Sequence, residues 1–170
     1  MTSSALLRPL LLGVATGMRS QLGLAALAWS GSAGSGDPAV LRKLHSPAGR
    51  VSLGLAAAGE VVADKLPQVP SRLRPSVFGG RLVSGAVVGA LAAGSTGRRA
   101  VATGGALGMA GAAAGAYAGA AYRRAAAQRS LPDLPFAVAE DAVAAGLAAT
   151  AVRIRPEPRP RWKRLPFTSR

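Results

Sequence analysis

Long apolar stretches separated by short polar connections make up most of the 170-residue chain. A helix that crosses the hydrocarbon of a bilayer needs roughly 20 mostly apolar residues. Connections rich in Gly, Ser and Pro separate the stretches, and Ser46 before Pro47 is typical of a helix start. The pattern predicts an all-α fold: a transmembrane bundle of four to five membrane segments at 1–152, followed by a basic, Pro-rich tail at 153–170. The five candidate segments lie at 5–29, 47–66, 81–98, 100–122 and 135–152.

The first of these stretches is irregular, because Arg19 lies in its middle. It either spans the membrane or is broken and re-entrant, turning back near residues 17–20. The re-entrant arrangement gives the larger imbalance of basic residues between the two sides. Cytoplasmic loops carry the excess of Lys and Arg, and both arrangements then place the C-terminus in the cytoplasm. The abundance of Ala, Gly and Arg is typical of bacteria, so we expect a multi-pass protein of the bacterial inner membrane.

Glycine recurs every four residues in several stretches, with the longest run at 111–119. This spacing places the glycines on one helical face, where they allow a neighbouring helix to approach closely. The same face could line a narrow pore, but close packing is the favoured explanation. We predict helix packing by a glycine zipper formed by Gly85, Gly89, Gly104, Gly108, Gly111, Gly115 and Gly119.

The charge of the chain is strongly basic, with 21 Lys and Arg against seven Asp and Glu and a net charge of +14. A nucleic-acid-binding domain would carry such charge throughout, whereas here it gathers in the connections and the tail. The tail directly follows a membrane segment and holds Trp162 and Phe167 among its cations. We therefore expect it to bind the anionic lipids of the cytoplasmic leaflet rather than nucleic acid.

The absence of Cys and the presence of a single His, His45, exclude several kinds of chemistry. Disulfides and Cys-ligated zinc are excluded, and triads based on His are nearly so. We expect no metal, no cofactor and no catalytic residues.

Five ionisable residues stand out inside the predicted membrane segments, at three places. Such a residue costs at least about 2.5–3.5 kcal/mol at the centre of a membrane helix, so it normally has a partner or a wet cavity. Glu60 and Glu140 each lie about 7.5 Å inside the end of a segment, at a rise of 1.5 Å per residue. Both ends lie on the same side of the membrane, so we expect the acidic residues in one layer. The candidate substrate or ion site comprises Arg19, Glu60, Asp64, Glu140 and Asp141.

Three functions are open for this layer. The leading hypothesis is a permease or channel-like protein for a small ion or solute, which we expect to be a homo-oligomer because 16.9 kDa of helices encloses little space. The alternative is a non-transporting scaffold or assembly factor in which the charges are structural ion pairs. A membrane-embedded enzyme with paired carboxylates is third, since no second motif supports it.

Two motifs carry a resemblance to a known family. The first is A-x-G-x-R-S at 15–20, and the second is E-x-x-x-D-K-x-P at 60–67, followed by R-L-V-S-G-A at 81–86. Together they resemble a bacterial family of small multi-span membrane proteins that is catalogued only as a domain of unknown function. The similarity covers residues 10–152 and omits the tail. It implies a membrane protein and includes Arg19, Glu60 and Asp64, but it implies no activity, substrate or cofactor.

Overall fold

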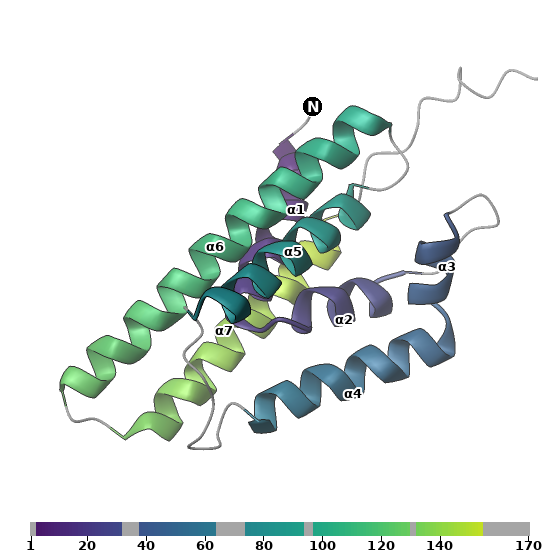
Figure 1. Cartoon of the computed structure of the whole chain (residues 1–170). Coiled ribbons are helices and arrows are strands. Elements are labelled where there is room, and N and C mark those ends of the chain that lie inside the picture. Colours follow the sequence, from purple (N-terminus) through teal and green to yellow (C-terminus); the bar gives the residue numbers. More distant parts are fainter. Residues whose placement is uncertain (1–2, 32–37, 64–73, 94–96, 130–131, 155–170) are drawn as a thin grey trace, which may run out of the picture.

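Seven α-helices make up the regular structure of the described residues in the computed structural model, which are 3–31, 38–63, 74–93, 97–129 and 132–154. The all-α class is therefore confirmed for these ranges. The long helix α6 runs along one side of a main bundle that includes α1, α5 and α7, while α3 and α4 lie apart from it (Figure 1). In chain order the helices are α1 (Ser3–Met18), α2 (Leu22–Trp29), α3 (Ala39–Leu44), α4 (Pro47–Ala63), α5 (Pro75–Ala92), α6 (Arg98–Gln128) and α7 (Asp133–Arg153).

Two of the described helices, α5 and α7, are long and apolar enough to cross a membrane. Helix α1 is apolar but has 16 residues, and α4 has 17. Helix α6 has 31 residues, but its many glycines lower its mean hydropathy. Length and composition thus identify two candidate spans, fewer than the four to five that the hydropathy pattern predicted.

Most helix boundaries lie close to the predicted ones. Helix α4 begins at Pro47, and Ser46 caps it, since its Oγ accepts a hydrogen bond of 3.1 Å from the amide of Gly49. Two stretches are exceptions. Helix α6, expected at 100–122, continues to Gln128, and the helix of the stretch expected at 81–98 is α5, which begins six residues earlier, at Pro75. The expected boundary residue, Arg81, is instead buried inside this helix.

The first predicted segment is broken into two helices, as one of its two predicted arrangements expects. Helix α1 ends at Met18, residues 19–21 form a turn, and α2 begins at Leu22. Helix α1 runs opposite to α5. Arg8, near the start of α1, bonds to the carbonyl of Ala92 at the end of α5, and Gly17, near the end of α1, bonds to Arg81 in the first half of α5.

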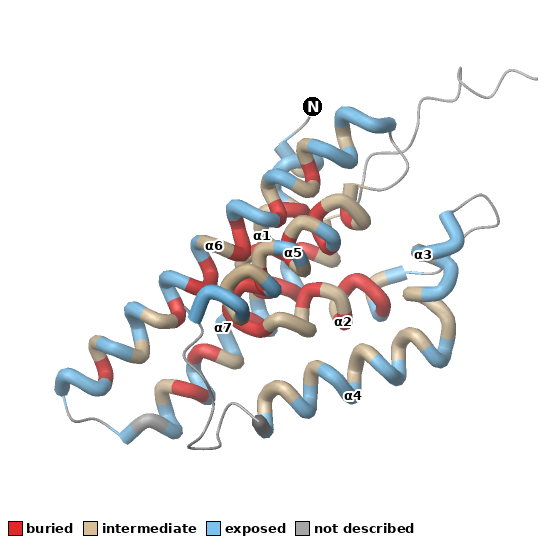
Figure 2. The backbone as a smooth tube through the Cα atoms, viewed as in Figure 1, coloured by how far each residue is buried: buried red, intermediate tan, exposed pale blue. Residues whose placement is uncertain are grey.

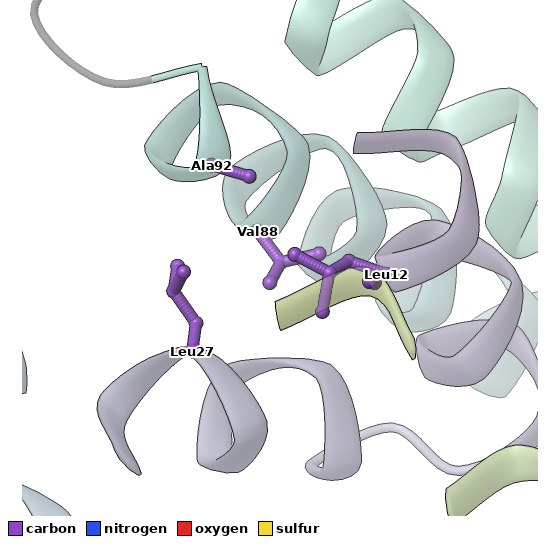
Figure 3. Close-up of a cluster of buried hydrophobic side chains, with 5 residues drawn as sticks. Leu12, Leu27, Val88 and Ala92 are labelled. Atoms are coloured by element: carbon purple, nitrogen blue, oxygen red, sulfur yellow. The ribbon is translucent and has the colours of Figure 1, made fainter. Parts of the chain in front are cut away.

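Helix α2 turns back from this point. Gly23 packs against Leu12 and Thr16 of α1. One turn later, Leu27 joins the core cluster that contains Val88 and Ala92, near the end of α5 (Figure 3). Helix α2 therefore advances in the direction of α5 and opposite to α1. The two helices form a hairpin, called here the α1–α2 hairpin, with its tip at 19–21.

Glycines hold α6 against both α1 and α5. A Cβ on Gly108 would lie closer than 3.0 Å to backbone atoms of Gly85 and Gly89 in α5, and a Cβ on Gly111 or Gly115 would lie as close to the backbone of α1. Buried positions recur along this side of α6 (Figure 2). The helices therefore approach each other backbone to backbone, as small residues permit. The remaining glycines of the predicted zipper are Gly104, which faces Gly89, and Gly119, which is buried.

Candidate functional site

The tip of the α1–α2 hairpin is where charged residues of three other helices meet Arg19 of the turn. Three charged side chains are almost completely buried: Arg19 at the tip is 2% exposed, Arg81 of α5 is 4% exposed and Glu140 of α7 is 2% exposed. Glu60 of α4 and Asp141 of α7 are partly buried, with 14% and 20% of their side chains exposed. We call these five residues the charged layer.

Arg19 connects the tip to α7. Its Nε donates a hydrogen bond to Oδ1 of Asp141, and its Nη2 forms an ion pair with the same oxygen. The main chain holds Arg19 in the turn, because its amide bonds to the carbonyl of Ala15 at 2.8 Å and its carbonyl accepts from the amide of Leu22 at 3.1 Å. The guanidinium is thus fixed at the point where the chain reverses.

Glu60 connects the tip to α4 by capping the N-terminus of α2. The first amides of a helix have no partner within the helix, and the side chain of the N-cap residue Gln21 supplies none. The two carboxylate oxygens of Glu60 accept instead, from the amides of Ser20 at 2.7 Å and Gln21 at 2.9 Å. A negative charge at a helix N-terminus is also favoured by the helix dipole.

Arg81 completes the connection from α5. Its Nη1 donates to the carbonyl of Gly17, at the end of α1, over 2.7 Å. Its Nη2 pairs with Oε1 of Glu60 at 3.3 Å. Glu60 and Arg81 together satisfy main-chain groups on both sides of the break. In a place without water, an unsatisfied backbone group costs several kcal/mol. These hydrogen bonds therefore allow the helix to be interrupted there.

The residues of the charged layer lie at similar depth. Helices α5 and α7 run in the same direction, since Ala92 and Ala151, near their C-terminal ends, belong to one core cluster. At 1.5 Å per residue, Arg81 lies about 9 Å from the first residue of α5, and Asp141 about 12 Å from the first residue of α7. In α5 and α7 the layer therefore lies inside the helix, whereas Glu60 lies in the last turn of α4 and Arg19 in the turn after α1.

Four of the five residues proposed from sequence take part in this layer: Arg19, Glu60, Glu140 and Asp141. The fifth, Asp64, lies outside the described residues. Sequence reasoning does not identify Arg81, because this residue stands at the polar boundary of the stretch expected at 81–98. Pro75 gives the signal that could have found it, since Pro is typical of the first turn of a helix and here places Arg81 well inside α5.

The charged layer contains two guanidiniums and three carboxylates. The described residues contain no cluster of three or more side chains arranged to hold a metal ion. The contacts of the layer are ion pairs and hydrogen bonds to the main chain.

Comparison with known proteins adds no family to this description, because no family model, no curated protein and no solved structure matches the chain.

Proposed function

We propose that the chain is a small multi-pass protein of the bacterial inner membrane that conducts a proton or a small cation through the charged layer. In this proposal α4, α5, α6 and α7 cross the membrane, and the α1–α2 hairpin enters from the cytoplasmic side and returns to it. The exposed apolar side chains of α4, which include Val51, Leu55 and Val62, then face lipid.

The observation that carries the proposal is the break at 19–21, with Arg19 at its tip inside a layer of three carboxylates. Within a membrane, non-helical backbone is tolerated only where protein buries it or where it lines a water-filled cavity. Broken helices that meet ionisable groups near the middle of the bilayer are typical of transporters. The carboxylates of the layer favour a cation or a proton as the transported species.

The orientation follows from the basic residues. Arg98 and Arg99 begin α6 beside the end of α5, and Arg153 ends α7 at the same end of the bundle. The tail at 155–170 adds further cations to this end. The positive-inside rule then places this end of the bundle on the cytoplasmic side, where the tail meets the anionic leaflet. Four spans and one hairpin enclose little volume, so we propose that the protein acts as a homo-oligomer.

The test is ion flux into liposomes that contain the purified protein, with separate dyes for protons, potassium and anions. Glu140→Gln removes one charge from the layer, and Asp133→Asn, at the first residue of α7, is the matched control. The proposal expects proton or cation flux that falls several-fold in Glu140→Gln and persists in Asp133→Asn. Absence of flux in the wild-type protein, or equal flux in a folded Glu140→Gln variant, would contradict it.

A second candidate function, a non-transporting scaffold or assembly factor, is favoured by the bonds of Glu60 and Arg81. Both side chains are committed to main-chain groups of the hairpin, as structural ion pairs would be. The scaffold predicts no flux for any ion, together with a loss of stability in variants of either residue. Flux that depends on Glu140 would exclude it.

A further inference from the structure

A mostly apolar groove of about 320 Å³ lies between α3 and α4, away from the charged layer. This volume falls at the lower end of the range typical of ligand sites, which is about 300–1,000 Å³. Helix α3 has no buried residue and packs on the start of α4, so the groove opens at the outside of the bundle. The lining residues are Val40, Lys43, Leu44, Ser46, Ala48, Gly49, Ser52 and Leu53.

Lys43 is the one charged residue among the described residues that line the groove. No carboxylate of the described residues contacts it, and 3–31 and 38–59 contain no Asp or Glu. The nearby guanidinium of Arg50 is engaged elsewhere, with the carbonyls of Ala28 and Gly31. The groove therefore combines an apolar wall with one cation at its rim, which suits a ligand that has an apolar part and a negative group.

The neighbouring Trp29 indicates the level at which the groove lies. Its side chain is 63% exposed, and its Nε1 donates to the carbonyl of Arg50 at 3.3 Å. Exposed Trp residues are typical of the boundary between lipid and water. Trp29 and the groove both lie beside the first residues of α4. The groove therefore lies at the boundary between lipid and water, on the cytoplasmic side.

We propose that the groove binds an anionic phospholipid, with one acyl chain along its apolar wall and the phosphate paired with Lys43. The proposal rests on the membrane location given under the proposed function, but not on transport. Basic pockets beside membrane helices on the cytoplasmic side are suited to anionic head groups. A second copy of the chain fits less well, because it would bring two basic rims together. Free phosphate also fits less well, because it would leave the apolar wall of the groove uncovered.

The test is lipid retention by the full-length protein in detergent, measured by native mass spectrometry with phosphatidylglycerol and phosphatidylcholine of identical acyl chains. Lys43→Gln removes the cation, and Ala48→Phe fills the groove without changing charge. Arg99→Gln is the matched control, because it removes an exposed cation that does not line the groove. We expect the wild-type protein to retain phosphatidylglycerol preferentially. Lys43→Gln should weaken this retention about five-fold, which corresponds to about 1 kcal/mol per basic residue.

Ala48→Phe should weaken the retention of both lipids, and Arg99→Gln should leave it unchanged. Equal retention of the two lipids by the wild-type protein, or equal losses in Lys43→Gln and Arg99→Gln, would overturn the proposal. Retention that Ala48→Phe leaves intact would also overturn it. Transport is measured separately in liposomes, so selective retention without ion flux would remove the proposed function and leave the lipid site.

Discussion

Arg19, at the tip of the α1–α2 hairpin, pairs with Asp141 of α7, which follows it by 122 residues in the chain. The guanidinium is 2% exposed, so it depends on the protein rather than on water for its partner. The pair connects the point where the first apolar segment reverses to the last helix of the bundle. It therefore contributes to the fold and to the charge of the layer at the same time.

A double-mutant cycle measures this connection. Arg19→Met and Asp141→Leu each leave a buried charge without its main partner, whereas the double variant removes both charges. We expect the double variant to be more stable than the sum of the single losses predicts, with a coupling energy of about 0.5–3 kcal/mol. Reversible unfolding in mixed micelles gives the free energy of unfolding of the wild-type protein and of each variant.

The matched control for the cycle is Arg19→Met combined with Thr150→Ala, an exposed residue of α7 about 13 Å further along the helix than Asp141. These two changes should be additive within about 0.3–0.5 kcal/mol. Equal coupling in both cycles would mean that Arg19 and Asp141 have no specific interaction.

Glu60 supports the hairpin through main-chain amides, so its loss should affect the α1–α2 turn before the rest of the bundle. Glu60→Ala removes the partner of Ser20, Gln21 and Arg81 and should cost about 3–5 kcal/mol, as for a broken buried ion pair. Glu60→Gln keeps an acceptor oxygen and should cost less.

Hydrogen exchange of the amides of Ser20 and Gln21 provides a local readout for these variants. Both amides should exchange faster in Glu60→Ala. Val62→Ala, an exposed position on the same helix, is the control and should change neither stability nor exchange. Unchanged exchange in Glu60→Ala would show that the cap does not hold the tip.

The glycine contacts of α6 give a test that compares neighbouring positions. Gly108→Ala would place a methyl group against backbone atoms of Gly85 and Gly89, so the helices must separate, at a typical cost of about 1–3 kcal/mol. Gly105→Ala meets Ala86 at 3.4 Å and Ala90 at 3.7 Å, both close to ordinary contact. It should be neutral or stabilise α6 by up to about 1 kcal/mol, because Ala is the better helix former.

Thermal unfolding of the two variants side by side measures this difference. A lower Tm for Gly108→Ala than for Gly105→Ala is the expected result. Equal Tm values would mean that the close approach of α5 and α6 contributes nothing to stability.

Features set by local spacing could be read from the sequence. The four-residue repeat of Gly104 and Gly108 needs no partner to be recognised, because helical periodicity alone puts both on one face. The start of α4 is equally local, since Ser46 and Pro47 are adjacent. The acidic positions Glu60 and Glu140 were also visible, because charge inside an apolar stretch stands out from its neighbours.

Features set by distant partners could not be read in this way. Arg81 bonds to Gly17 and Glu60, which lie 64 and 21 residues away in the chain. The break at 19–21 contains no Pro, while Pro9 lies inside α1 and does not end it. The sequence leaves a break near residues 17–20 open as one of two arrangements. It does not show which groups of α4 and α5 satisfy the backbone that the break frees.

The most direct test of the re-entrant hairpin is the accessibility of single cysteines, which the Cys-free chain makes simple. Ser3→Cys and Gly31→Cys flank the hairpin, and Arg129→Cys lies at the far end of α6. Labelling with a membrane-impermeant maleimide, in intact cells and in inside-out vesicles, should find positions 3 and 31 on the cytoplasmic side and position 129 on the opposite side. Positions 3 and 31 on opposite sides of the membrane would contradict the hairpin and, with it, the placement of Arg19 at its tip.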